Sequence, residues 1–375
     1  MLISAQQLLQ SEESSLAPYA LRSSQSKGRK YAEIADPYRC SFQRDRDRIV
    51  HSKAFRRLSG KTQVFVATHG DHFRSRLTHS LEVSQVSRDV ARTLGLNEDL
   101  CEVIALAHDL GHTPFGHAGE EAMHDMMTRC DSQFEHNDQS KRIVETLERK
   151  SPDYPGLNLS FETLEGMMKH RKMHDDGKTL VIHSLESQLV DTADAIAYHH
   201  HDLDDGLRSG ILSSDHISAH VDIWKQAIED LDSACLGEDL FRHLAINNVI
   251  GLMIHDLAES AHKNIEEAGI GEPITSPEYH SVIRFGHTMQ KKVDQLAEYL
   301  GQTFYLHETV TRYSAQGQSV IKGLFRLFTK KFELLPKSIR DLYKHEHQHI
   351  VIKDYIAGMT DHYASTFFAE HKNIL

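Results

Sequence analysis

The chain has 375 residues, a hydrophobic content of 39%, 8 prolines and a net charge of -12. This length is sufficient for one large domain or two ordinary ones, each with a sizeable core. The negative charge argues against a general electrostatic attraction to nucleic acid. A membrane span would need about 20 consecutive apolar residues, and the sequence has no such stretch.

The N-terminal sequence bears on the cellular location, and the spacing of the cysteines bears on cross-links and zinc binding. The N-terminal stretch MLISAQQLLQSEESS carries acids where a signal peptide would carry basic residues, so we expect a cytoplasmic protein. The cysteines are scattered and form no CxxC pair, which argues against a structural zinc site and a disulfide framework. They are Cys40, Cys101, Cys130 and Cys235.

Apolar residues at helical spacing dominate the chain after a polar segment, 1–40, that we expect to be poorly ordered or irregular. Alternating β-branched residues suggest strands only at 63–66 and 305–310. The sequence therefore predicts an all-α fold with at most a minor β-hairpin. A weak boundary near 205–215 would separate a catalytic core, 41–210, from a C-terminal helical region, 211–375, that packs on it. Helices are predicted at 45–58, 78–94, 98–110, 118–127, 138–149, 184–200, 215–231, 238–267, 276–300, 317–329 and 336–371.

Basic residues are concentrated in the first of these helices and just after it. Such a cluster is typical of a solvated helix surface, but it would also suit a wall that faces phosphate or a subunit interface. The cluster comprises Arg44, Arg46, Arg48, Lys53, Arg56, Arg57 and Lys61.

The string AHDLGHTPFGHAGE at 107–120 places His108 and Asp109 at the end of an apolar helix. Burying a carboxylate there is unfavourable unless a cation neutralises it, and a divalent metal with one imidazole and one carboxylate ligand would do so. The HD dipeptide alone is weak evidence, because it recurs at 174–175, 201–202 and 255–256.

The residues around this pair strengthen the case for chemistry. Gly111 and Gly116 allow tight turns, and His112 and His117 bring two further imidazoles to the same loop. His117 and Glu120 are three residues apart at a helix start, so they share a face. A single such histidine usually makes a structural hydrogen bond, whereas two beside an HD pair favour a functional site.

Two other helices carry candidate partners for the pair. His79 begins the helix at 78–94, with Arg76 one turn before it. Asp194, Tyr198 and Asp202 follow one another at i, i+4 and i+8, which predicts a polar face looking into a cavity. The alternative for this face is a solvent-exposed stripe.

The order H…HD…D resembles that of the HD metal-dependent phosphohydrolases. More narrowly, the chain resembles the deoxyguanosine triphosphate triphosphohydrolase (dGTPase) family from about Gln43 to Ala364. The segments that carry this resemblance are FQRDRDRIVHSKAFRRLSGKTQVF, SRLTHSLEV, AHDLGHTPFGHAGE, FEHNDQS, VDTADAIAYHHHDLDDG and VIKDYIAGMTDHYA.

The resemblance implies an HD-domain helical core and a hydrolase that converts a dNTP and water into a deoxynucleoside and triphosphate. It implies a divalent metal cofactor (Mn2+, Mg2+, Fe2+ or similar), dGTP as one candidate substrate and a homo-oligomer, with a dNTP or nucleic acid as a possible effector. Base preference, the metal used in vivo, oligomeric state and regulation leave no signal in the sequence.

The resemblance also implies roles for individual residues. The metal ligands would be His79, His108, Asp109 and Asp194. The catalytic residues would be His112, His117, Glu120 and His136. The substrate-binding residues would be Gln63, Arg76, Tyr198 and Asp202. Two neutral and two anionic ligands would neutralise a divalent ion, and either His112 or His117 could protonate the departing 5′ oxygen.

Three other functions remain open at this point. The same metal site would serve an HD phosphohydrolase that acts on nucleoside monophosphates or on a hyperphosphorylated guanine nucleotide. A sensor that binds nucleotides or single-stranded DNA without turnover could keep the fold, although it would not need all four ligands. A helical scaffold with incidental histidines would leave the motif at 107–120 unexplained.

Overall fold

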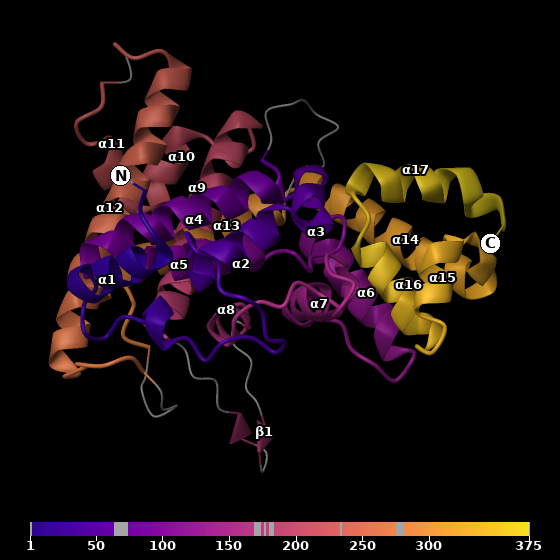
Figure 1. Cartoon of the computed structure of the whole chain (residues 1–375). Helices are drawn as coiled ribbons and strands as arrows, with labels where there is room; N and C mark the ends of the chain where they lie inside the picture. The colour runs from indigo at the N-terminus through magenta and orange to yellow at the C-terminus, as the bar shows by residue number, and fades with distance from the viewer. Residues whose placement is uncertain are drawn as a thin grey trace. The chain divides into compact units, whose positions relative to one another are not determined.

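The computed structural model describes residues 2–63, 74–168, 174–175, 178–179, 184–232, 235–274 and 281–374. These residues are mainly helical, which confirms the predicted fold class (Figure 1). Among them, the sheet consists of two short antiparallel strands, β1 (His174–Asp175) and β2 (Lys178–Thr179). No helix of the described ranges is both long and apolar enough to cross a membrane.

The chain forms two compact units that interleave along the sequence. Unit 1 consists of Met1–Ile49, Leu81–Leu106 and Asn158–His307. Unit 2 consists of Val50–Ser80, Ala107–Leu157 and Glu308–Leu375. Each unit is assembled from segments far apart in sequence, so the expected division of roles between 41–210 and 211–375 stays a prediction.

Unit 1 is built around its longest helices. Helix α12 (Glu238–Glu267) buries Ala245, Val249, Met253, Leu257, Ala261 and Ile265. This spacing of four residues gives α12 one apolar stripe. The helix packs against α9 (Leu185–Arg208) and α11 (Asp222–Ile228), and α13 (His287–Leu300) also packs on α9. The other helices of this unit are α1 (Ala5–Ser15), α2 (Ser41–Val50), most of α4 (Arg76–Leu94), α5 (Glu98–Ala107), α8 (Phe161–Gly166), α10 (Ser214–His220) and the turns η1 (Ser23–Gln25) and η5 (Gly301–Tyr305).

The N-terminal segment contains a helix, α1, where the sequence predicts irregular backbone. Ser4 and Gln7 form a capping box that satisfies the free amides at the start of α1. Further along, Arg29 forms an ion pair with the buried Asp45, whose other oxygen accepts a hydrogen bond from the Ser160 backbone at 2.8 Å. Buried polar contacts of this kind hold the segment in place. They leave no periodic pattern of apolar residues in the sequence, so the sequence did not predict them.

Unit 2 has its own core beneath α14 (Glu308–Lys330). This helix packs against α6 (Gly116–Thr128), α16 (Gln348–Ala357) and α17 (Asp361–His371). The contacts are apolar and include Met123, Met127, Leu324, Phe328 and Ile352. The remaining helical elements are α3 (Lys53–Arg57), η2 (Leu58–Gly60), α7 (His136–Arg142), η4 (Ile143–Leu147), η6 (Phe332–Leu334), α15 (Lys337–Leu342) and η7 (Lys372–Ile374).

The structure contradicts one of the two predicted strands, and the other lies almost wholly outside the described residues. The prediction for 305–310 is wrong, because Tyr305 ends a helical turn and α14 begins at Glu308. The local β-branched residues lie at the start of an amphipathic helix that buries Val310, so packing outweighs local propensity. Of the other candidate, 63–66, only Gln63 is described, and it lies in a bend rather than a strand.

Three arginines of the basic cluster form ion pairs with acids of the same unit. Arg44 and Arg48 both form ion pairs with Glu33, and Arg46 lies 3.0 Å from Glu102. The interpretation of this segment as a phosphate-facing wall is therefore wrong for these three arginines. Paired side chains of this kind stabilise the local structure and have little positive charge left for a ligand.

Candidate active site

The loop after α5 begins the candidate site. Helix α5 ends at Ala107, earlier than the predicted helix at 98–110, and His108 and Asp109 follow it directly. The imidazole of His79 comes from the first turn of α4. Each of the three side chains is almost inaccessible to solvent.

These three side chains point their ligand atoms toward one another. Nε2 of His108 lies 3.3 Å from Oδ1 of Asp109, and Nε2 of His79 lies 3.9 Å from Oδ2 of the same carboxylate. All three ligand atoms lie within 4.8 Å of one another. Two imidazole nitrogens and one carboxylate oxygen are a suitable partial ligand set for a divalent transition metal. The residues present therefore fit a metal site.

Arg76 lies against the same carboxylate. Its Nη1 donates a hydrogen bond of 2.8 Å to Oδ2 of Asp109, and the guanidinium is 2% exposed. Its Nε and Nη2 have no hydrogen-bond partner among the described residues. Burial by itself would raise the pKa of Asp109, but His108, Arg76 and His112 together hold that pKa well below its usual value. Asp109 is thus an anion, and Arg76 has donors to spare.

A row of alternating imidazole and carboxylate side chains extends from Asp109. Nε2 of His112 lies 3.1 Å from Oδ1 of Asp109, and its Nδ1 lies 3.7 Å from Oε2 of Glu120. His136 approaches the other oxygen of Glu120 with its Nδ1 at 2.9 Å and its backbone nitrogen at 2.8 Å. The rings of His112 and His136 stack at a centroid distance of 4.0 Å. The structure therefore brings these predicted catalytic residues together.

Glu120 is the carboxylate that these imidazoles share. Burial opposes its ionisation, but the contacts with His117 and His136 hold its pKa far below the usual value. His112 behaves in the opposite way, because its own burial, reinforced by Arg76, lowers the pKa of its imidazole well below the ordinary one. At neutral pH, Glu120 is therefore ionised and His112 is neutral.

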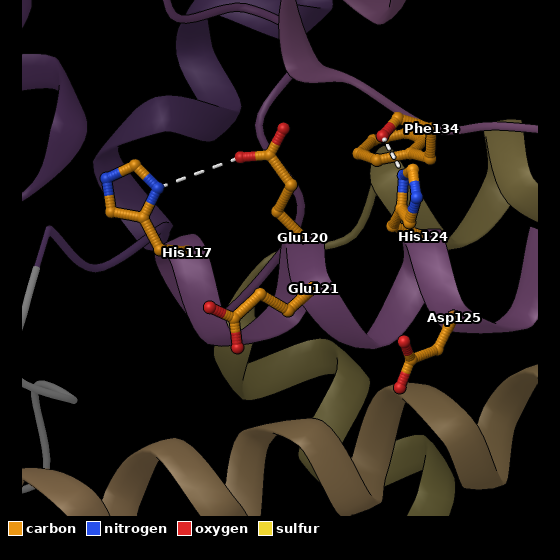
Figure 2. A pocket seen from close by; sticks show the side chains of 6 residues that line it. All are labelled: His117, Glu120, Glu121, His124, Asp125 and Phe134. Atoms are coloured by element: carbon orange, nitrogen blue, oxygen red, sulfur yellow. Dashed lines mark hydrogen bonds and ion pairs between the residues drawn. The ribbon is translucent and has the colours of Figure 1, made fainter.

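His117 connects this row to a surface cavity. The cavity measures about 460 Å³ and is lined by His117, Glu120, Glu121, His124, Asp125 and Phe134. Figure 2 shows the His117 ring and the Glu120 carboxylate facing each other, at 3.7 Å between Nδ1 and Oε2. The His117 side chain is 62% exposed. Solvent or a ligand therefore reaches His117 more easily than the other side chains of this row.

Two glycines let this loop take its shape, each in a different way. Gly116 follows Phe115, and both have a positive φ, of 58° and 65°, a conformation that is rare outside glycine. Gly111 instead permits a close approach, because an added Cβ would lie 2.1 Å from the carbonyl oxygen of His136. The start of α7 can therefore press against the loop, which places His136 beside His112.

A buried lysine and a buried aspartate hold the loop in place through hydrogen bonds to its backbone. Nζ of Lys61 donates to the carbonyl oxygens of His112 at 2.6 Å and Ala357 at 2.8 Å. Asp361 accepts hydrogen bonds from the backbone nitrogens of Thr62 and Phe115, each at 3.0 Å. Both residues join the loop that carries His112 and Phe115 to the C-terminal helices α16 and α17. The sequence did not reveal these hydrogen bonds, although VIKDYIAGMTDHYA contains Asp361.

Replacement of Lys61 by Met should change how stability depends on pH. Burial, with Arg76 nearby, lowers the pKa of Lys61 from 10.5 to about 7. Between these values the unfolded chain holds a proton that the folded chain has released, so the free energy of unfolding rises with pH across this window. Lys61→Met removes that rise and leaves two carbonyls without their donor, at a cost of about 1–3 kcal/mol.

Urea denaturation at the two ends of this pH window tests the expectation. Wild type should gain stability over the variant as the pH increases. The same pH dependence in both proteins would show that Lys61 stays protonated throughout.

The polar face predicted on α9 lies in unit 1 and acquires a partner that the sequence missed. Tyr305 donates a hydrogen bond to Oδ2 of the buried Asp202, and the Tyr198 ring lies 6.2 Å from that of Tyr305. Burial raises the pKa of Asp202 to about 8. Its Oδ1 has no hydrogen-bond partner in the described part of the chain. Tyr305 carried no signal, because its surroundings suggested a strand.

The predicted residues thus divide between the two units. His79, Arg76, His108, Asp109, His112, His117, Glu120 and His136 come together in unit 2. Gln63 belongs to the same unit, and a Cβ on Gly116 would lie 2.9 Å from its carbonyl oxygen and 3.5 Å from Nη2 of Arg76. Asp194, Tyr198 and Asp202 lie on α9 in unit 1, and their participation in the site stays a prediction.

The chain is similar to known proteins over most of its length. The HD domain profile matches residues 76–211, and that of the phosphohydrolase-associated domain matches residues 283–370. The chain is similar to a deoxyguanosinetriphosphate triphosphohydrolase-like protein of Geobacter sulfurreducens, with 41% identity over 94% of both chains. A protein of the same name from Nitrosomonas europaea is 43% identical over 94% of this chain and 96% of its own length. Another, from Leptospira interrogans, is 40% identical over 98% of this chain and 99% of its own.

A helical fold, a buried His/His/Asp cluster and the two matching domains define the chain as an HD-domain phosphohydrolase. Because the relatives match it over almost its whole length, the chain belongs to the family of deoxyguanosinetriphosphate triphosphohydrolase-like proteins.

Proposed function

We propose that this protein is a metal-dependent dNTP triphosphohydrolase that accepts dGTP among its substrates. The convergence of His79, His108 and Asp109 beside an arginine with spare donors carries the proposal. The names of the relatives, deoxyguanosinetriphosphate triphosphohydrolase-like proteins, support the substrate class. In the reaction, water attacks the α-phosphorus, the bond to the 5′ oxygen breaks, and a deoxynucleoside and triphosphate leave.

His79, His108 and Asp109 would hold the divalent ion, with Asp194 of α9 as the fourth ligand. When bound, such an ion supplies a Lewis acid for a phosphoryl oxygen and lowers the pKa of water. Burial of the ligands keeps bulk water away, which strengthens every charge interaction in the site. Asp109, held as an anion by its neighbours, is ready to bind a cation without first losing a proton.

Arg76 would bind the triphosphate. Its Nε and Nη2 are buried donors without a partner among the described residues, and phosphate oxygens are the acceptors that a guanidinium fork fits best. Gln63, Tyr198 and Asp202 would contact the nucleotide, mainly at its sugar. A carboxyl with a pKa near 8 is protonated at neutral pH, so Asp202 could donate a hydrogen bond to a sugar hydroxyl.

His117 would donate the proton to the departing 5′ oxygen. Among the three imidazoles around Glu120, His117 is the most exposed, and it lines the cavity. The lowered pKa of His112 makes that ring a poor acid at neutral pH. Glu120 would orient His117, and His136 holds Glu120 from the other side. His112 would link the carboxylates of Asp109 and Glu120.

A product analysis tests the proposed function. Protein loaded with Mn2+ or Mg2+ is mixed with each of the four dNTPs, and the products are separated by ion chromatography. Free triphosphate with a deoxynucleoside is expected for at least dGTP. Orthophosphate or pyrophosphate would indicate a different phosphohydrolase, and tight binding without hydrolysis would indicate a nucleotide sensor.

A further inference from the structure

A second group of potential metal ligands lies in unit 1. It consists of Glu82 on α4 and two adjacent histidines on α9, His200 and His201. None of the three belongs to the proposed active site. His201 and Asp202 form one of the HD dipeptides that recur in the sequence.

The ligand atoms of this group converge on one carboxylate oxygen. Nε2 of His200 lies 3.3 Å from Oε2 of Glu82, and Nε2 of His201 forms an ion-pair contact with the same oxygen. The three ligand atoms lie within 4.8 Å of one another. The two rings approach to a centroid distance of 4.2 Å and are tilted by 59°, so their nitrogens reach one point from different directions.

Both imidazoles are shielded from solvent. His200 is 5% exposed and His201 is fully buried. Neutral imidazole nitrogen together with carboxylate oxygen is the donor set that Zn2+, Fe2+, Co2+ and Ni2+ prefer. The Glu82 side chain is 31% exposed, whereas its Oε2, on which both imidazoles converge, is buried.

We propose that Glu82, His200 and His201 bind a second divalent transition-metal ion, in addition to the ion of the active site. Bound there, it joins α4 to α9 within unit 1. These helices carry His79 and Asp194, so the second ion fixes the helix that presents each of those ligands. An ion that binds only the folded chain also stabilises it, by an amount that grows with the ion concentration.

Metal counting tests the site directly. The full chain is stripped with a chelator, titrated with Co2+ and analysed for bound cobalt, with the thermal unfolding midpoint measured in parallel. Wild type should bind two ions, and Glu82→Gln should bind one because a carboxamide is a weak ligand. The matched control is Asp89→Asn, which removes an exposed carboxylate from the same helix and should still bind two.

A crossed variant separates this site from the active site. Asp109→Asn should lose the active-site ion and keep the second one, and adding Glu82→Gln to it should leave none. If Glu82→Gln fails to fold, as circular dichroism would show, the ion that Asp109→Asn retains still decides the matter. Wild type that saturates at one ion, lost in Asp109→Asn, would overturn the proposal. Equal cobalt content in wild type and a folded Glu82→Gln would overturn it as well, and would leave a His/Glu hydrogen-bond network.

Discussion

Replacing Asp109 by Asn is expected to lower the rate of dNTP hydrolysis by roughly a thousandfold. The carboxylate faces His79, His108 and Arg76 at once, and an amide cannot replace its charge toward a cation. Metal assistance contributes several kcal/mol to transition-state stabilisation, and a loss of about 4 kcal/mol corresponds to this factor. Steady-state rates and bound metal, measured on the same sample, should fall together.

Stability provides an internal control for that variant. Asp109→Asn leaves the buried guanidinium of Arg76 without its anion, and breaking a buried pair from one side costs about 3–5 kcal/mol. Adding Arg76→Met removes the orphaned charge, so the double variant should regain stability but not activity. If activity returned along with stability, the loss in the single variant would be a folding defect and Asp109 would not be a metal ligand.

Replacing Glu120 by Gln should lower kcat by about 10²- to 10³-fold while the bound metal stays unchanged. The carboxylate lies 3.7 Å from Nδ1 of His117 and would orient that ring, and a positioned proton donor contributes about 10²- to 10⁴-fold to a rate. Glutamine is close in shape and can still accept a hydrogen bond from His136. KM should therefore change much less than kcat, and steady-state kinetics at several pH values would measure both.

The neighbouring residue offers a matched control for Glu120. Glu121 lies on the same helix and lines the same cavity, but its contact is with the amide of Gln318 at 3.0 Å. Glu121→Gln should leave kcat within a few-fold of wild type. An equal loss in both variants would point to the electrostatics of the cavity as a whole, and the assignment of His117 as proton donor would then fail.

Features that depend on local periodicity could be predicted from the sequence. Helix α12 lies at 238–267 as expected, because an apolar residue every fourth position defines a helix without help from the rest of the chain. The His108-Asp109 pair could be placed at the end of α5 for the same reason. A carboxylate and an imidazole that follow an apolar helix are expected to be buried, and a buried carboxylate needs a neutralising cation.

Features that depend on distant partners could not be predicted. Lys61 was grouped with surface arginines, yet it lies buried between the carbonyls of His112 and Ala357. Nothing near Lys61 in sequence distinguishes it from Arg56 or Arg57, since its acceptors come from other segments. The interleaved units, the ion pairs of Arg44 and Arg48 with Glu33, and the contact of Tyr305 with Asp202 are of the same kind.

Hydrolysis of dGTP by the metal-loaded protein in water labelled with heavy oxygen tests the central claim most directly. Mass spectrometry of the products should find one labelled oxygen in triphosphate and none in deoxyguanosine, because water attacks phosphorus and the 5′ oxygen leaves with the sugar. Label in orthophosphate or pyrophosphate, with a nucleotide as the other product, would contradict the proposed triphosphohydrolase activity. Labelled deoxyguanosine would contradict the proposed attack on the α-phosphorus.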